Sequence, residues 1–168
     1  MVMRNVISRQ VLSAVLALTA LAAFPGLAGD EPAPRFRAKT LTGETFTNDS
    51  VKGKVVLLQF WTTWCKFCRR EQDLVDSINK EFADKGLVLL AVSVGESKKT
   101  VKKFLAENPR SVRIVLTEDT NLAAMYQATS YPLYVAIDRE GNVAGTQRGA
   151  VGERALRSLL SRAGLESE

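Results

Sequence analysis

The chain contains two long runs of apolar residues, and each has the pattern of a strand that is buried on both faces of a sheet. They cover residues 55–61 and 87–94, and a single polar side chain interrupts each run. Continuous apolar runs of this length are typical of central strands covered by helices. Three further, shorter strands are predicted over residues 114–116, 133–137 and 143–147. The last two flank a turn-forming segment with Gly141, which favours an antiparallel hairpin.

Helical periodicity accounts for most of the remaining apolar residues. Four segments are predicted to be helical, residues 65–85, 97–108, 121–126 and 154–163. In the first segment the apolar stripe begins at Phe67 and continues to Phe82, and Gly86 marks the end of the helix. Ser97 is a suitable N-cap for the second segment.

The order of these elements predicts the fold class. A weak hairpin formed by residues 36–39 and 45–47 comes first, strands then alternate with helices, and an antiparallel hairpin and a helix come last. This order predicts an α/β domain with a central mixed β-sheet flanked by helices.

The first 28 residues have the features of a signal peptide. Arg4 and Arg9 lie in a leading segment without acidic residues. An apolar stretch follows over residues 11–24, and small residues stand after it at Gly26 and Ala28. Basic start, apolar centre and small residues in this order are what a signal peptidase recognises.

The predicted organisation is therefore a signal peptide over residues 1–28, a linker over residues 29–34 and a single domain over residues 35–168. The apolar stretch is shorter than the about 20 residues that span a membrane, and an uncleaved N-terminal membrane anchor is the alternative. In both cases we expect the domain to be periplasmic or otherwise extracytoplasmic.

Charge is well mixed along the predicted domain. The chain has 23 basic and 18 acidic residues, and Arg4 and Arg9 are the basic residues that precede residue 29. No block of basic residues with interleaved aromatic side chains occurs, so we expect no nucleic-acid partner.

Cysteine usage points to the chemistry. The chain has two cysteines, Cys65 and Cys68, and no histidine. A structural zinc site usually needs four Cys or His ligands, so we expect no metal. A bridge that closes so short a loop contributes little stability, about 2 kcal/mol. A purely structural disulfide is therefore the weaker alternative to redox use.

The position of the pair supports redox use. Cys65 falls at the predicted start of a helix, where unpaired N–H groups and the helix dipole favour the reactive thiolate. Cys68 follows one turn later, so it can form a disulfide with Cys65 or resolve a mixed disulfide.

Residues 58–71, Leu-Gln-Phe-Trp-Thr-Thr-Trp-Cys-Lys-Phe-Cys-Arg-Arg-Glu, resemble the active-site segment of thioredoxin-like proteins. They are most similar to the TlpA/ResA/CcmG branch of exported thiol–disulfide oxidoreductases. Three further segments resemble that branch in the same order, residues 52–56, 91–94 and 131–141. The likeness spans about residues 35–163. It implies a thioredoxin-like fold with an N-terminal β extension and an αβ insertion.

The resemblance implies roles for single residues. Cys65 and Cys68 would be the catalytic dithiol, and a cis peptide bond would hold Pro132 against it. Tyr131 would then face the extended chain of a partner. Glu71 matches an acidic residue of the branch and could carry protons for the dithiol; a solvated helix residue is the alternative.

Three more residues are predicted to contact partners, namely Trp64, Lys66 and Phe67, although Trp64 could also pack over the disulfide together with Trp61. Phe67 stands where relatives commonly have proline, so the motif leaves the direction of electron flow open. Gln59 replaces the buried aspartate of thioredoxin, so a proton relay must use Glu71 or water.

The predicted function is thiol–disulfide exchange with exported proteins, most simply as a reductase and without a cofactor. By resemblance, a membrane thiol transporter would supply electrons, and the clients would belong to cytochrome c or copper-centre maturation or be other exported proteins. The alternatives are a disulfide oxidase or isomerase, and a non-redox module that binds peptides. A peroxiredoxin is disfavoured because Cys65 belongs to a close CxxC pair.

Overall fold

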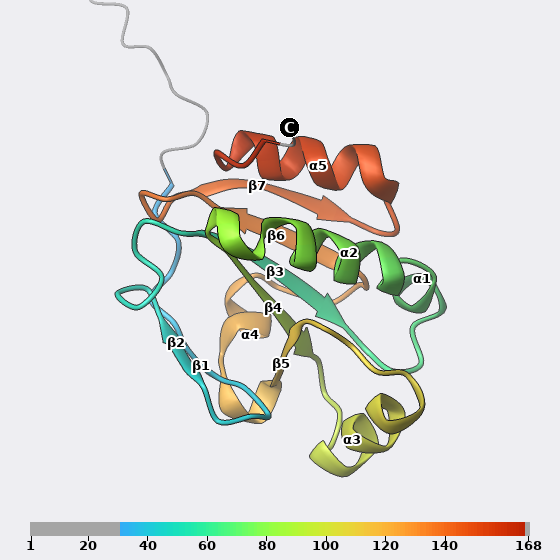
Figure 1. The fold of residues 1–168 in the computed structure, drawn as a ribbon. Coiled ribbons are helices and arrows are strands. Elements are labelled where there is room, and N and C mark those ends of the chain that lie inside the picture. Colours follow the sequence, from blue (N-terminus) through green and yellow to red (C-terminus); the bar gives the residue numbers. More distant parts are fainter. Residues whose placement is uncertain (1–30, 167–168) are drawn as a thin grey trace, which may run out of the picture.

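The computed structural model describes residues 31–166 (Figure 1). The predicted signal peptide or membrane anchor lies outside the described residues. Within residues 31–166 the strands are β1 (Arg37–Lys39), β2 (Thr45–Thr47), β3 (Val55–Trp61), β4 (Leu87–Ser93), β5 (Arg113–Leu116), β6 (Leu133–Ile137) and β7 (Val143–Arg148). The helices are α1 (Lys66–Arg70), α2 (Gln72–Phe82), α3 (Lys98–Glu107), α4 (Leu122–Met125) and α5 (Gly152–Arg162), with short 3-10 turns η1 (Ala83–Lys85) and η2 (Thr117–Asp119).

A mixed sheet with the strand order β5-β4-β3-β6-β7 forms the centre of the fold. The central strand β3 pairs in parallel with β4 and antiparallel with β6. β4 pairs in parallel with β5, and β6 and β7 form the predicted antiparallel hairpin. The predicted fold class, a mixed β-sheet flanked by helices with a β extension ahead of it, is confirmed.

The two faces of the sheet carry separate apolar cores, because successive side chains of a strand point to opposite faces. On β3, Leu57 and Trp61 belong to the core that α2, α3 and α5 cover, whereas Leu58 and Phe60 belong to the core beneath α4 and β1. Figure 1 shows α2 and α5 together on one face and α4 on the other. All seven residues of β3 are buried, as its continuous apolar sequence predicts.

The predicted helix over residues 65–85 is divided in the structure. α1 ends at Arg70, α2 begins at Gln72, and Glu71 between them has φ −96° and ψ 3°. Neither glycine nor proline occurs at this point, so the sequence pattern does not show the break. The predicted apolar stripe was also wrong at its first member, because the side chain of Phe67 is 53% exposed.

The N-terminal extension is packed onto the sheet domain. β1 and β2 pair around Gly43, and Thr40 forms an isolated bridge with Val115 at the edge strand β5. Residues 31–33 belong to the expected linker, yet Pro32 bridges Asn142 and the N–H of Ala33 donates to a carbonyl of the β6–β7 turn. The described end of the linker is therefore held against the domain.

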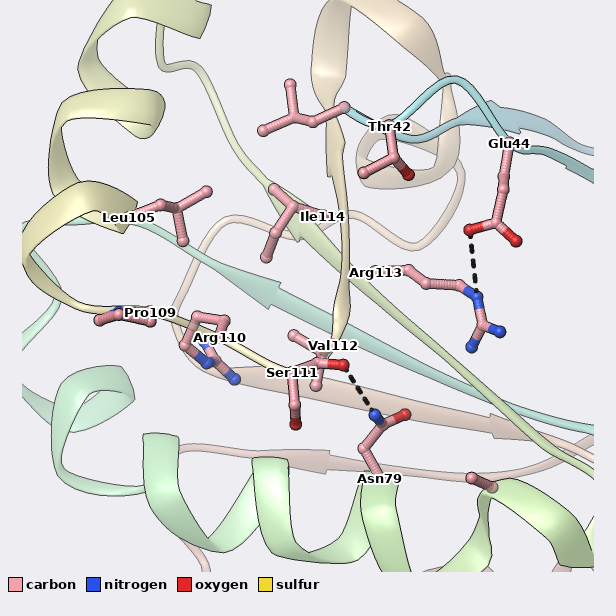
Figure 2. A pocket seen from close by; sticks show the side chains of 12 residues that line it. Thr42, Glu44, Asn79, Leu105, Pro109, Arg110, Ser111, Val112, Arg113 and Ile114 are labelled. Atoms are coloured by element: carbon pink, nitrogen blue, oxygen red, sulfur yellow. Dashed lines mark hydrogen bonds and ion pairs between the residues drawn. The ribbon is translucent and has the colours of Figure 1, made fainter.

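A hollow of about 580 Å³ lies beside the start of β5 (Figure 2). Figure 2 shows Leu105 and Ile114 across it, with the amide of Asn79 donating to the carbonyl of Ser111 and Arg113 paired with Glu44. It shares no lining residue with the hollow beside the cysteines that is described below.

Among residues 31–166, no helix has the length and apolar character needed to cross a membrane.

Candidate active site

Cys65 and Cys68 form a disulfide where β3 leaves the sheet and α1 begins. Cys65 is the N-cap of α1, and its sulfur accepts a hydrogen bond from the backbone N–H of Cys68 at 3.1 Å. The two Cα atoms are 5.3 Å apart, within the usual range for a disulfide. Both side chains are buried, with exposed fractions of 5% and 3%. The predicted junction of strand and helix thus places the pair together.

The segment before β6 lies next to the cysteines. The peptide bond between Tyr131 and Pro132 is cis, as the resemblance implied, and Pro132 is buried. The rings of Tyr131 and Trp64 meet edge to face with centroids 6.1 Å apart. We use the name dithiol hollow for a depression of about 330 Å³ lined by Trp64, Cys65, Lys66, Phe67, Thr129, Ser130 and Tyr131. It therefore contains every residue that was predicted to contact partners.

Two aromatic side chains of the dithiol hollow are unusually exposed for their size. Trp64 is 70% exposed and Phe67 is 53% exposed. Trp61, in contrast, is buried and packs against Phe104 of α3, with ring centroids 5.6 Å apart. Of the two tryptophans predicted to shield the disulfide, Trp61 is a packing residue and Trp64 presents its ring to solvent. Exposed aromatic groups beside a concave site are typical of surfaces that bind partners.

Glu71 is buried rather than solvated, with an exposed fraction of 6%. Its carboxylate accepts hydrogen bonds from the hydroxyl of Tyr134, at 2.8 Å, and from the backbone N–H of Gly152, at 2.6 Å. These contacts connect the end of α1 with β6 and with the start of α5. They hold the backbone at the point where α1 and α2 separate, which accounts for a break that the sequence did not show.

The hydrogen bonds continue behind Glu71 into the sheet. Gln59 lies opposite Tyr134 in the β3–β6 pairing, and its amide nitrogen donates to the tyrosine oxygen at 3.3 Å. Arg110 in turn donates through a terminal nitrogen to the amide oxygen of Gln59 at 3.5 Å, and its Nε donates to both carboxylate oxygens of Asp76. The three hydrogen bonds from Arg110 to Gln59, from Gln59 to Tyr134 and from Tyr134 to Glu71 therefore run in one direction and end at the carboxylate.

Sequence reasoning identified Glu71 and Gln59 but missed Tyr134, Arg110 and Asp76. Tyr134 is part of an apolar run, and only its register opposite Gln59 reveals its role. The side chain of Arg110 is 2% exposed although it follows a proline in a polar segment, where arginine is normally solvated.

Within residues 31–166, no group of three His, Cys, Asp or Glu side chains is placed to hold a metal ion.

Comparison with known proteins assigns the chain to a family. The model of the AhpC/TSA family matches residues 30–146. The thioredoxin-like protein YneN of Bacillus subtilis is 35% identical over 138 residues, which are 80% of this chain and 80% of that relative. The thiol-disulfide oxidoreductase ResA of Bacillus subtilis is 30% identical over 129 residues, covering 77% of this chain and 72% of the relative. A solved thiol:disulfide interchange protein of the thioredoxin family from Chlorobium tepidum superposes with a TM-score of 0.68 at 26% identity, covering 79% of this chain and 95% of that one.

All three tyrosines of the chain ionise above their ordinary range in the folded protein. Burial raises the pKa of Tyr126 to about 12. Burial also raises the pKa of Tyr131, and that of Tyr134, whose hydrogen bond to Glu71 adds to the effect. In the unfolded chain these phenols ionise near about pH 10. The contribution of these tyrosines to folding stability is therefore fully present below about pH 10 and decreases as the pH rises above it, because the unfolded chain releases its phenolic protons first.

We expect the phenolate absorbance of the native protein to appear at distinctly higher pH than that of the urea-unfolded protein. The substitution Tyr134→Phe should reduce the loss of unfolding free energy between about pH 9 and pH 11, and Tyr131→Phe, at a more exposed position, should reduce it less. Native and unfolded protein titrating together near about pH 10 would contradict this assignment.

Proposed function

The chain belongs to the AhpC/TSA family and, within it, to the TlpA/ResA-like thiol–disulfide oxidoreductases, and from this premise we propose that it reduces disulfides in exported proteins. The observation that carries the proposal is the position of Cys65, whose sulfur caps α1 at the edge of the dithiol hollow. An N-cap sulfur that already accepts a backbone N–H is prepared to carry the negative charge of a thiolate.

The reaction needs no group beyond the two cysteines and the client disulfide. The Cys65 thiolate attacks one client sulfur, the client S–S bond breaks, and a mixed disulfide forms while the second client sulfur leaves as a thiolate. Cys68 then loses its proton and attacks the sulfur of Cys65, which releases the first client sulfur. Both client thiolates take up protons, the client gains two electrons, and the Cys65–Cys68 disulfide closes.

Burial of the dithiol supports the reducing direction. Both sulfurs are almost fully buried, and burial disfavours the charged thiolate relative to the neutral disulfide. A site that stabilises its disulfide gives electrons away readily and has a low reduction potential. The oxidase alternative is favoured by a different observation, the cations Lys66, Arg69 and Arg70 on α1, because positive charge stabilises the thiolates.

We further infer that the protein works outside the cytoplasm, where disulfides in its clients can persist. The signal-peptide pattern in the first 28 residues and the membership in the TlpA/ResA-like group support this location. Recycling requires a dithiol donor at the same side of the membrane, and a membrane thiol transporter is the donor that we propose. Cytochrome c or copper-centre maturation is the proposed setting for the clients.

Substitution of the two cysteines separates their roles. We expect Cys65→Ser to lose catalysed reduction of insulin disulfides, because the attacking sulfur is gone. Cys68→Ser should instead accumulate mixed disulfides with clients through Cys65, and dithiothreitol should release them. The double variant Cys65→Ser/Cys68→Ser is the matched control and should trap nothing. A wild-type protein that reduces no insulin disulfides, together with a Cys65→Ser variant that binds exported clients as well as wild type, would favour a non-redox peptide-binding module. Rapid consumption of peroxide by the reduced wild type would favour a peroxidase.

The reduction potential decides the direction of electron flow. For a reductase we expect a value near about −270 mV, the thioredoxin end of the scale, from equilibration with thiol–disulfide buffers of known composition. A value near about −120 mV, the DsbA end, would overturn the reductase proposal in favour of the oxidase.

Glu71 is proposed to handle the proton of Cys68. Both residues are buried, and they stand one helical turn apart in the chain. A carboxylate beside a thiol opposes formation of a second negative charge and can accept the proton that the thiol gives up. The hydrogen bonds from Tyr134 and Gly152 fix this carboxylate in place.

The test uses the Cys65→Ser background, in which Cys68 is the only cysteine. We expect Glu71→Gln to lower, by about one unit, the pH at which alkylation of Cys68 reaches half its maximal rate, since the opposing charge is removed. Asp73→Asn, at an exposed position of the first turn of α2, is the matched control and should leave the profile in place. If the pH profile of Cys68 alkylation is the same in Glu71→Gln as in Asp73→Asn, the proposed proton transfer is wrong and Glu71 has a structural role.

A further inference from the structure

The dithiol is bordered by exposed cations from two helices. α1 contributes Lys66, Arg69 and Arg70, and α3 contributes Lys99 and Lys103. We call these five residues the basic rim. Within residues 31–166 none of them forms an ion pair with a carboxylate. No carboxylate of the described residues pairs with their charge, and all five side chains are exposed to solvent.

Two contacts bring α3 next to the dithiol. Thr63, in the loop that leads to Cys65, lines a depression of about 340 Å³ together with Lys99 and Lys103. Arg69 of α1 lies over the ring of Phe104 at 5.9 Å, and Phe104 lines the same depression. The cations of α1 and α3 consequently belong to one surface, on either side of Phe104.

Acidic groups on this surface are few or already engaged. The carboxylate of Glu96 accepts hydrogen bonds from the backbone N–H of Thr63 and from the hydroxyl of Ser93, both at 2.8 Å. Glu107 is the carboxylate that lines the depression beside Lys103. On this exposed surface the five cations of the basic rim therefore outnumber the carboxylates of Glu96 and Glu107.

The basic rim adjoins an apolar binding element. Lys66 lines the dithiol hollow together with the exposed rings of Trp64 and Phe67. Arg70 lies over the ring of Phe67 at 5.1 Å, which places a guanidinium at the edge of that hollow. A partner that fills the hollow must therefore bring its neighbouring residues within reach of several positive charges.

We propose that this face selects client segments in which the reactive cysteine has an apolar neighbour and acidic residues close to it in sequence. The proposal rests on the proposed exchange reaction and specifies its substrate class. The apolar side chain enters the dithiol hollow, and the carboxylates meet the basic rim. Complementary charge mainly increases the rate of encounter, and it acts over about 8 Å at physiological ionic strength.

The test compares three synthetic peptides that share one disulfide and one apolar neighbour and carry flanking glutamate, serine or lysine residues. Reduced wild-type protein should attack the glutamate peptide about ten times faster than the lysine peptide at low salt, with the serine peptide between them. The difference should shrink strongly at about 0.5 M salt, where charges are screened. The second-order rate constant from stopped-flow fluorescence is the measurement.

Charge reversal on α3 locates the effect. The double variant Lys99→Glu/Lys103→Glu should lose most of the preference for the glutamate peptide. The control Lys98→Glu/Lys102→Glu changes the net charge equally on the same helix, but neither residue lines the depression beside Thr63. It should retain most of the preference. Circular dichroism establishes that both variants are folded.

The outcomes separate this inference from the proposed function. Equal rates for the three peptides with wild-type protein, or a preference for the lysine peptide, would overturn the inference while leaving disulfide reduction intact. Equal effects of the two double variants would overturn the assignment to the basic rim, since net charge alone would then account for them. Failure to reduce any of the three peptides would overturn the proposed function itself.

Discussion

The hydrogen bond from the backbone N–H of Cys68 to the sulfur of Cys65 joins the fold to its chemistry. β3 is buried along its whole length, so the chain must leave the sheet at Trp61 before any of its residues can meet a partner. The N–H of Cys65 then donates to the carbonyl of Thr62, which turns the chain into α1. A residue with a side-chain acceptor is needed at that turn to cap the helix. Here the acceptor is the sulfur of Cys65. The same hydrogen bond therefore caps the helix and stabilises negative charge on the nucleophile.

Two opposing influences act on the charge of the dithiol. Burial of both cysteines and the proposed action of the Glu71 carboxylate disfavour thiolates, whereas the N-cap hydrogen bond and the cations of α1 favour them. Burial acts on both cysteines, whereas the carboxylate of Glu71 is proposed to act on Cys68, which precedes it by one helical turn. The N-cap hydrogen bond and the cations of α1 act mainly on Cys65, which lines the dithiol hollow. This asymmetry agrees with the proposed order of events, in which Cys65 attacks as a thiolate and Cys68 keeps its proton until the mixed disulfide has formed.

The sequence predicted those parts of the molecule that depend on local pattern. The run over residues 55–61 gave β3 with both ends correct, Ser97 caps α3 as expected, and the CxxC pair lies where strand changes to helix. The misses depend on contacts between distant residues. Phe67 fits the apolar stripe of one continuous helix, but α1 ends at Arg70 and buries Cys68 instead, which leaves Phe67 exposed. The break at Glu71 is fixed by Tyr134 and Gly152, far along the chain, and no local signal announces it.

A series of hydrogen bonds between buried side chains leads from Arg110 through Gln59 and Tyr134 to Glu71. It explains why position 59 is an amide rather than a second acid in a fold that already buries the carboxylate of Glu71. A carboxylate at the position of Gln59 would place a second negative charge in contact with the oxygen of Tyr134, which already donates to Glu71. An amide can donate to Tyr134 through its nitrogen and accept from Arg110 through its oxygen, so both of its ends are satisfied. Arg110 then balances its charge against Asp76 rather than against Glu71. Glu71 thereby accepts its hydrogen bonds from two neutral donors, the hydroxyl of Tyr134 and the backbone N–H of Gly152, while the cations of the basic rim lie exposed at the surface.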